Sequence, residues 1–282
     1  MKVHPLGEEI GAEVTDVDVR TMSEAAWHRI YQTWLEHGVL VVRDQQLDLD
    51  DFYQYSLRFG PVEAHPSKST RHPEFPKITV LGVGKFDEDG RLNIAIYGRG
   101  ADCFHTDGAY DQDPFKATQL YAIALPSRGG DTYFASMHSA YNALPQRLKD
   151  KLAGKRAAFR YGGRTARRVE LLPEEDRAVP PAIHPLFRVH PETGRTALYF
   201  DPGKILQIEG LKESESDEII DELETYMLQP RGQYTHKWRL GDVVVWDNRS
   251  SYHKAAGDYP PEEDRIHWRV SIKEYGSPIK PD

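Results

Sequence analysis

His105 and Asp107 stand two positions apart in the stretch FHTDGAY. In an extended backbone, side chains at this spacing point to the same face, so an imidazole and a carboxylate can approach one object while Thr106 points away. Both groups are metal ligands, and a third donor would hold a catalytic transition metal with coordination positions left open. His253, which follows a run of valines and a polar turn, is the candidate for that donor. Two histidines with one carboxylate are typical of Fe(II) oxygenases.

Each of these residues also has a plain structural interpretation. A histidine beside a strand is usually a hydrogen-bonded surface or core group, and a His-x-Asp triplet often occurs by chance. The metal-site hypothesis therefore depends on the motifs around the triplet.

Two arginines near the end of the sequence have a spacing that suits a carboxylate ligand. In RIHWRVSI, Arg265, His267 and Arg269 alternate with apolar or aromatic residues, so a strand here places both guanidinium groups on one face. A guanidinium pairs with a carboxylate through two parallel hydrogen bonds, which suits arginine to fixing one end of a dicarboxylate. The alternative is two exposed arginines in surface ion pairs, each contributing about 0–1 kcal/mol.

Four segments have the periodicity of helices and would help to position these residues. They are expected at about 21–38, 48–60, 138–153 and 214–229. Thr21 with Glu24 forms a capping-box pattern, Asp48 and Ser214 are candidate N-caps, and Pro145 suits a first helical turn.

Short segments rich in β-branched and aromatic residues account for most of the remainder. They are VLVVR, KITVLGVG, ATQLYAIAL, DTYFAS, HPLFRVH, TALYF, YTHKWRL, DVVVWD and RIHWRVSI. Many short strands without regular strand–helix alternation favour an antiparallel sandwich or barrel. We therefore expect a mostly β fold with flanking helices and a jelly-roll core, in a single domain over residues 1–282. The polar stretch 160–182 is expected to be a lid, a partner surface or a plain solvated loop.

The composition excludes several classes of function. The 282 residues carry a formal net charge of -8, which opposes general binding to nucleic acid or anionic membranes. The sequence has no run of roughly 18 apolar residues and no apolar signal core at its start, so we expect a cytoplasmic protein. The single cysteine, Cys103, excludes an intrachain disulfide and cysteine-rich zinc sites.

Several motifs, in order along nearly the whole chain, carry a resemblance to a known family. They are LVVRDQ, RFGPVEAHP, HTD, LPSRGGDTYFASMHSAYNALP, HPLFRVHPETGRTALYF and WDNRSSYH followed by RIHWR. In these motifs the chain resembles the taurine dioxygenase and 2,4-dichlorophenoxyacetate dioxygenase family. The resemblance implies a double-stranded β-helix, which is the jelly-roll core, with Fe(II), 2-oxoglutarate and O2. It also implies hydroxylation, or another oxidation at a C–H bond, of a small organic substrate, with release of succinate and CO2.

The resemblance also implies roles for individual residues. The iron ligands would be His105, Asp107 and His253. Thr132 and Arg265 match the family positions that hold the distal carboxylate of 2-oxoglutarate.

Other matched positions concern the substrate. Arg269 matches an arginine that faces the substrate anion in the taurine enzyme and that can serve 2-oxoglutarate in other members, and His65 matches a substrate-binding histidine. Together with Arg99 they could give a carboxylate or sulfonate a local counter-charge within an acidic protein. Ala101 replaces an asparagine of the taurine enzyme, which argues against taurine and suggests a bulkier anion. Tyr110 could line an apolar pocket for that anion.

Two interpretations from other classes stay open at this point. A cupin-like zinc protein could use the same three donors for non-redox chemistry, but it would leave Arg265 and Thr132 without a dicarboxylate to hold. A catalytically idle sensor could bind 2-oxoglutarate, although the intact ligand set gives it no positive support. As in the family, we expect a homo-oligomer.

Overall fold

The computed structural model describes residues 1–65, 68–82, 103–167, 178–260 and 262–276. Within these ranges most of the ordered elements are strands, accompanied by five α-helices and short 3₁₀ turns. The expectation of a mostly β fold with flanking helices is therefore confirmed. None of the helices in these ranges combines the length and the apolar character needed to cross a membrane.

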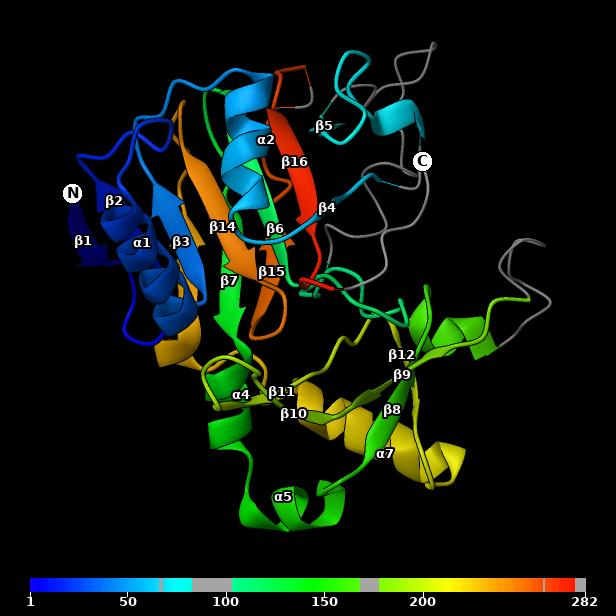
Figure 1. The fold of residues 1–282 in the computed structure, drawn as a ribbon. Helices are drawn as coiled ribbons and strands as arrows, with labels where there is room; N and C mark the ends of the chain where they lie inside the picture. Colours follow the sequence, from blue (N-terminus) through cyan, green and yellow to red (C-terminus); the bar gives the residue numbers. More distant parts are fainter. Residues whose placement is uncertain (66–67, 83–102, 168–177, 261, 277–282) are drawn as a thin grey trace.

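An eight-stranded sheet is the largest element of the fold (Figure 1). Its order is β1-β2-β3-β14-β6-β16-β4, and β5 also pairs with β16. The strands are β1 (Lys2–Pro5), β2 (Ala12–Thr15), β3 (Val39–Val42), β4 (Val62–Glu63), β5 (Thr79–Leu81), β6 (Ala117–Ala124), β14 (Val243–Asp247) and β16 (Ile266–Ile272). The β2–β3 pair is parallel, and the other neighbours are antiparallel.

A three-stranded sheet covers one face of the large sheet. It consists of β13 (Gln233–His236), β7 (Thr132–Ser136) and β15 (Ser251–Ala255), with β7 in the middle. Side chains alternate along β14, so Val244 and Trp246 point to the face where they share an apolar cluster with Phe134 of β7. Val243 and Val245 point to the opposite face. The alternation in VVVWD thus places a layer of side chains between the two sheets.

Helices α1 (Glu24–His37) and α2 (Leu49–Leu57) pack on the other face of the large sheet (Figure 1). Trp34 of α1 and Phe52 of α2 are fully buried in the same cluster as Val243 and Val245. The helical periodicity in the sequence predicted both helices, because their apolar residues recur at the spacing of one helix face.

The start of α1 differs from the prediction. The N-cap is Ser23, whose hydroxyl accepts a hydrogen bond from the Ala26 amide at 3.2 Å, and Thr21 lies before the helix. The capping box with Thr21 does not form because the helix begins at Glu24, which is therefore the first helical residue rather than the third, and the Glu24 carboxylate binds Arg58 at 2.7 Å. The predicted N-cap of α2, Asp48, is confirmed and forms a capping box with Asp51.

The segments between β7 and β13 form a group at one end of the two sheets, in the lower half of Figure 1. Its strands are β8 (Arg156–Phe159), β9 (Ala182–Pro185), β10 (Phe187–Val189), β11 (Thr196–Leu198) and β12 (Ile205–Ile208), and its helices are α4 (Met137–Ala143), α5 (Gln146–Leu152) and α7 (Glu213–Glu224). One apolar cluster joins these elements to Ala135 of β7 and Tyr252 of β15. The group therefore shares a core with the small sheet.

Two helix boundaries in this group differ from the predictions. The segment expected as one helix at 138–153 is divided at Leu144, which is extended because it precedes Pro145, and Pro145 is the N-cap of α5 rather than a residue of its first turn. Helix α7 begins after Lys212, so Ser214 lies inside its first turn, and it ends at Glu224.

The polar stretch 160–182 is described only in part, because residues 168–177 lie outside the described ranges. Its first part contains the 3₁₀ turn Gly163–Arg167 and is bound to α7. Arg167 donates to Asp217 at 2.8 Å, and Arg164 pairs with Asp221 at 2.8 Å. This part of the stretch is thus attached to the surface of the fold.

Candidate active site

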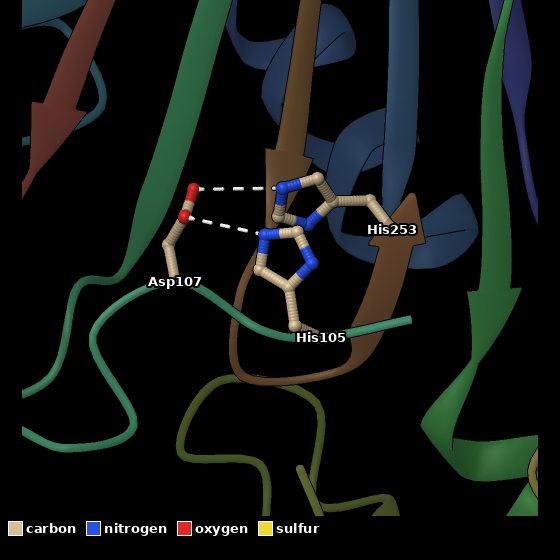
Figure 2. Close-up of side chains that lie close together, drawn as sticks. All are labelled: His105, Asp107 and His253. Carbon is tan, nitrogen blue, oxygen red and sulfur yellow. Dashed lines mark ion pairs between the residues drawn. The ribbon is translucent and has the colours of Figure 1, made fainter. Parts of the chain in front are cut away.

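His105, Asp107 and His253 meet at one point, as the sequence predicted (Figure 2). Their ligand atoms all lie within 4.8 Å of one another. The Asp107 carboxylate faces both rings, with Oδ1 4.0 Å from His105 Nε2 and Oδ2 3.8 Å from His253 Nε2. Two imidazole nitrogens and a carboxylate that converge in this way fit a divalent transition metal with open coordination positions.

The backbone explains why residues so far apart in sequence meet here. His105 forms an isolated antiparallel bridge with His253, in which each amide donates to the carbonyl oxygen of the other residue, at 3.0 and 2.9 Å. The Thr106 side chain turns away from the pair, and its hydroxyl donates to the Asn248 carbonyl at 2.7 Å. His253 lies in β15, which the sequence analysis did not predict, because SYHKA has no apolar alternation.

The ring orientations leave both Nε2 atoms available to a metal. His105 Nδ1 lies 3.1 Å from the Cys103 carbonyl oxygen, so Nδ1–H can donate there and Nε2 keeps its lone pair. Burial, followed by the nearby charge of His105, holds the pKa of His253 well below its usual value. A neutral imidazole at this position is the form that binds metals.

Two contacts fix the Asp107 carboxylate. Thr118 donates to Oδ2 at 2.6 Å, and Arg269 Nη2 lies 2.9 Å from the same oxygen. Burial alone would raise the pKa of Asp107, but Arg269 and the two histidines hold this pKa well below the usual value. Asp107 is therefore an anion in the folded protein.

A cavity of about 210 Å³ opens beside the three side chains. Its lining residues are Leu81, His105, Asp107, Leu120, Thr132, Trp246, His253, Ala255, Arg265 and Arg269. The three predicted iron ligands and the two predicted 2-oxoglutarate ligands, Thr132 and Arg265, thus share one cavity with Arg269. Apolar side chains from β5, β6 and β14 form the rest of the wall.

Arg265 is held at the edge of this cavity by neutral groups. Its Nε donates to the Gly130 carbonyl oxygen at 2.7 Å and its Nη2 to the Thr132 hydroxyl at 3.3 Å. In the described parts of the chain no carboxylate forms an ion pair with it, and burial lowers its pKa from the usual arginine value. Arg265 precedes β16, where the pairing with β6 shifts register, rather than lying within the strand as the alternation predicted.

Two further residues around the cavity were not predicted. Trp238 donates its indole N–H to the Thr132 hydroxyl at 3.0 Å. Asn248 donates to Thr118 at 3.0 Å and accepts from the Trp246 indole at 3.0 Å, so it orients the threonine that holds Asp107. The tryptophans were visible in the sequence only as strand-forming residues, since hydrogen bonds between distant segments leave no local pattern.

Comparison with known proteins identifies the family. The profile of the family described as "Taurine catabolism dioxygenase TauD, TfdA family" matches residues 2–271. The chain belongs to this family.

Two relatives that are similar to the chain over most of its length are named for organic anions as their substrates. It is 30% identical to the (S)-phenoxypropionate/alpha-ketoglutarate-dioxygenase of Sphingobium herbicidovorans, over 96% of this chain and 94% of that protein. It is 31% identical to the alpha-ketoglutarate-dependent 2,4-dichlorophenoxyacetate dioxygenase of Cupriavidus pinatubonensis, over 89% of this chain and 90% of that protein. The crystal structure of a taurine dioxygenase from Burkholderia xenovorans superposes with a TM-score of 0.79 and 27% identity, covering 97% of this chain and 89% of that one.

The protein is therefore a 2-oxoglutarate-dependent non-haem iron dioxygenase of the TauD/TfdA family, with Fe(II), 2-oxoglutarate and O2 as its cofactor and co-substrates. The donor set fits this iron, because two histidines and one carboxylate would hold Fe(II) and leave coordination positions open for the co-substrates. The cavity next to the donors holds an arginine without a carboxylate partner among the described residues.

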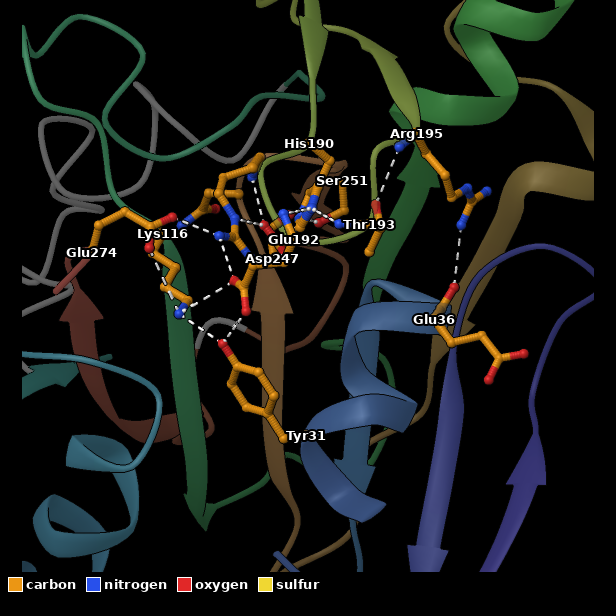
Figure 3. A network of polar contacts seen from close by, with 12 residues as sticks. Tyr31, Glu36, Lys116, His190, Glu192, Thr193, Arg195, Asp247, Ser251 and Glu274 are labelled. Carbon is orange, nitrogen blue, oxygen red and sulfur yellow. Dashed lines mark hydrogen bonds and ion pairs between the residues drawn. The ribbon is translucent and has the colours of Figure 1, made fainter. Parts of the chain in front are cut away.

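The WDNR motif of this TauD/TfdA chain has a structural role in the turn before β15. Arg249, which is 1% exposed, binds Asp247 at 2.6 Å and Glu192 at 2.8 Å, and Asp247 also contacts His190 at 3.0 Å. Figure 3 shows Asp247, Glu192 and His190 within this network. The buried ion pairs fix the turn from which β15 carries His253 into the site.

The residues expected to bind substrate are less centrally placed. Tyr110 is 40% exposed and is not among the residues that line the cavity. His65 is not among the residues that line the cavity, and its Nδ1 lies 3.3 Å from the Thr70 hydroxyl. Arg99 and Ala101 lie outside the described residues.

Proposed function

We propose that this dioxygenase oxidises a C–H bond of a small organic anion, with His105, Asp107 and His253 as iron ligands and with Arg265 and Thr132 as the site for the distal carboxylate of 2-oxoglutarate. Bound iron with 2-oxoglutarate and O2 supplies the oxidising power, and succinate and CO2 are released. The other steps are positioning steps that the side chains of this chain perform.

The observation that carries the proposal is the contrast between the buried Arg249 and the half-buried Arg265. Burial alone would lower the pKa of Arg249, but Asp247 and the other carboxylates around the guanidinium raise it above the usual value. Among the described residues, Arg265 donates its hydrogen bonds to the neutral oxygens of Gly130 and Thr132 and forms no ion pair, although it lies beside the three metal donors. A desolvated guanidinium is costly without an anion, so Arg265 is suited to bind one from solution.

The residues around the three donors exclude water from the cavity and fix the Asp107 carboxylate. Leu81, Leu120 and Trp246 give the cavity an apolar wall. This wall keeps water from the reacting atoms and would strengthen the ion pair between Arg265 and the distal carboxylate of bound 2-oxoglutarate. Thr118 and Arg269 keep Asp107 ionised and oriented toward both histidines. The site is thus organised before ligands arrive.

For the substrate, we infer an aryloxyalkanoate or a similar carboxylate, with a sulfonate as the second chemical class. The similar enzymes of Sphingobium herbicidovorans and Cupriavidus pinatubonensis act on phenoxypropionate and 2,4-dichlorophenoxyacetate, respectively. Arg269 is the cationic group of the cavity that lies nearest to the donors, and this position suits it to bind the substrate anion. Tyr110, His65 and Arg99 stay proposed substrate contacts.

We also propose that the two sheets form the jelly-roll core expected for the family, within one domain that spans the chain. The shared apolar layer between β14 and β7 and the shared core between the small sheet and the α4–α7 group support this proposal. A lid function for 160–182, a cytoplasmic location, a homo-oligomeric state and the lack of nucleic-acid or membrane partners stay predictions from the sequence.

The co-substrate site is tested by binding. Arg265→Ala should weaken binding of 2-oxoglutarate to the anaerobic Fe(II) protein at least about thirtyfold, because the carboxylate loses its charged partner. Isothermal titration calorimetry measures the dissociation constant. Arg231→Ala, which removes a 69% exposed arginine, is the control and should leave it unchanged. An unaltered constant in Arg265→Ala would assign the distal carboxylate to another group.

The substrate class is tested by succinate release. Phenoxyacetate, 2-phenoxypropionate, a neutral aryl ether, alkyl sulfonates and amino acids should be compared at equal concentration with the same enzyme. We expect aryloxyalkanoates to stimulate succinate formation most strongly. Stimulation by sulfonates alone, or by neutral aryl ethers as much as by the acids, would contradict the proposed substrate class.

A further inference from the structure

The Thr132 hydroxyl receives two hydrogen bonds from side chains that lie far away in sequence. Trp238 Nε1 donates to Thr132 Oγ1 at 3.0 Å, and Arg265 Nη2 donates to the same oxygen at 3.3 Å. A hydroxyl has two acceptor lone pairs and one hydrogen. With both lone pairs occupied, the only remaining hydrogen-bond capacity of Thr132 is that of a donor.

The position of Thr132 gives this donor a direction. Thr132 opens β7, is 4% exposed and lines the cavity that also contains the three metal donors. The two incoming N–H groups come from the segments after β13 and before β16, and they leave the O–H hydrogen for an acceptor in the cavity that Thr132 lines. A carboxylate bound by Arg265 is such an acceptor, since the guanidinium and the hydroxyl are already in contact.

The indole of Trp238 is itself held rigidly. Its ring packs between the imidazoles of His236, at 4.5 Å between centroids, and His267, at 4.4 Å. His236 is fixed in turn by Asp242 at 3.1 Å and by the Tyr234 hydroxyl at 2.8 Å. This chain of contacts prevents the indole N–H from turning away from Thr132.

The imidazole of His267, which packs against Trp238, carries no charge that would change this arrangement. His267 is fully buried, and neither of its ring nitrogens has a hydrogen-bond partner among the described residues. Burial, followed by the charge of Arg265, holds the pKa of His267 well below its usual value, so it adds no second cation beside the arginine. Arg265 also lies over the Trp238 ring, with its Cζ 5.9 Å from the centroid.

We propose that Trp238 is a positioning residue for the co-substrate: its indole N–H fixes the Thr132 hydroxyl as a donor that points into the cavity, toward the distal carboxylate of the keto acid. This inference rests on the proposed co-substrate site at Arg265 and Thr132. It adds a residue that contacts neither the metal donors nor the ligand.

Trp238→Phe is the direct test, because phenylalanine keeps an aromatic ring beside Arg265 and removes the N–H donor. The dissociation constant of N-oxalylglycine, an unreactive analogue of 2-oxoglutarate, is measured calorimetrically on the full-length protein loaded with Mn(II). We expect it to rise about three- to tenfold, the effect of one neutral hydrogen bond. The thermal unfolding temperature shows whether the variant is folded.

A double-mutant cycle separates positioning from packing. In the Thr132→Val background the hydroxyl is absent, so Trp238→Phe should have no further effect on N-oxalylglycine binding. The same substitution should also leave binding of 2-oxovalerate unchanged, because this keto acid has the chain length of 2-oxoglutarate without the distal carboxylate. An equal loss in the valine background, an equal loss for 2-oxovalerate, or no loss with N-oxalylglycine would each overturn the proposal.

A second replacement keeps the test valid if Trp238→Phe unfolds the protein. Site-specific incorporation of 3-benzothienylalanine at position 238 replaces the N–H by sulfur and preserves the bicyclic shape. We expect the same three- to tenfold loss of N-oxalylglycine affinity. Wild-type affinity with this residue would overturn the proposal. The Arg265→Ala result separates the proposed co-substrate site from the proposed role of Trp238. If Arg265→Ala weakens binding and the position-238 variants do not, only the role of Trp238 is contradicted.

Discussion

Arg265 and Arg269 lie four positions apart and face one cavity, yet they make different contacts. Arg269 binds the Asp107 carboxylate at 2.9 Å, whereas Arg265 contacts the neutral oxygens of Gly130 and Thr132. Alternation along the strand predicted that both guanidinium groups reach the same side. It could not predict which arginine has a carboxylate of the chain beside it, because Asp107 comes from a distant loop.

Gly130 gives a prediction about the local fit of Arg265. Its φ is 75°, and a Cβ added to it would lie 3.1 Å from Arg265 Cδ and Nε, so Gly130→Ala should displace the guanidinium. We expect the dissociation constant of 2-oxoglutarate to rise about three- to tenfold, because charge-assisted hydrogen bonds depend on geometry.

Gly154→Ala is the matched control for this prediction. Gly154 has a φ of 70°, but a Cβ there would meet nothing within 4 Å. Both substitutions should cost about 1 kcal/mol of stability from the left-handed backbone, and only Gly130→Ala should weaken co-substrate binding. Equal binding constants in the two variants would show that Arg265 tolerates the added methyl group.

Several residues that shape the site could not be predicted from the sequence. Thr118, Asn248 and Trp238 act through hydrogen bonds to partners in other segments. The metal donors were predicted because their chemistry is rare and because they lie within motifs shared with a known family. Orienting threonines and tryptophans have common side chains and many other uses, so only the folded geometry identifies them.

Helices and long apolar strands were predicted better than element boundaries. The valine run of β14 and the periodic apolar residues of α1 reflect burial, which the sequence records directly. Strand β15, which carries His253, is polar and was not predicted, since its pairing with β7 comes from backbone hydrogen bonds. The cap of α1 was misassigned because Ser23, two residues after Thr21, accepts the Ala26 amide, so the helix begins too late for a box between Thr21 and Glu24.

The start of α1 can be tested by stability measurements. Ser23→Ala removes the hydroxyl that accepts from the Ala26 amide and should lower the free energy of unfolding by about 1 kcal/mol. Thr21→Ala should change it by less than about 0.5 kcal/mol, since Thr21 is exposed and precedes the helix. Denaturant titration of both variants measures the difference, and a larger loss in Thr21→Ala would restore the cap that the sequence suggested.

The buried ion-pair network connects distant parts of the molecule. Glu192 comes from the β10–β11 hairpin, Asp247 from β14 and Glu274 from the segment after β16, and all three bind Arg249. Tyr31 of α1 donates to Glu192 at 2.7 Å (Figure 3). The network thus joins the helical face, the large sheet and the hairpin around the turn that leads to His253.

Loss of the central cation should destabilise the whole fold. Arg249→Met leaves the buried Asp247 carboxylate without its cationic partner, and we expect the free energy of unfolding to fall by roughly 3–5 kcal/mol. Arg147→Met breaks an exposed pair with Glu222, in which Arg147 is 64% exposed, and should cost less than about 1 kcal/mol. Similar losses in urea titrations of the two variants would mean that the network contributes no more than a surface pair.

The assembled ligand set is the basis of the functional account, and anaerobic spectroscopy tests it directly. Addition of 2-oxoglutarate to the Fe(II) protein should produce the weak visible charge-transfer band of a keto acid chelated to iron. His105→Ala and His253→Ala should abolish this band, while His4→Ala, which alters an exposed histidine of β1, should retain it. A wild-type protein without the band, or a full band in either ligand variant, would contradict the account.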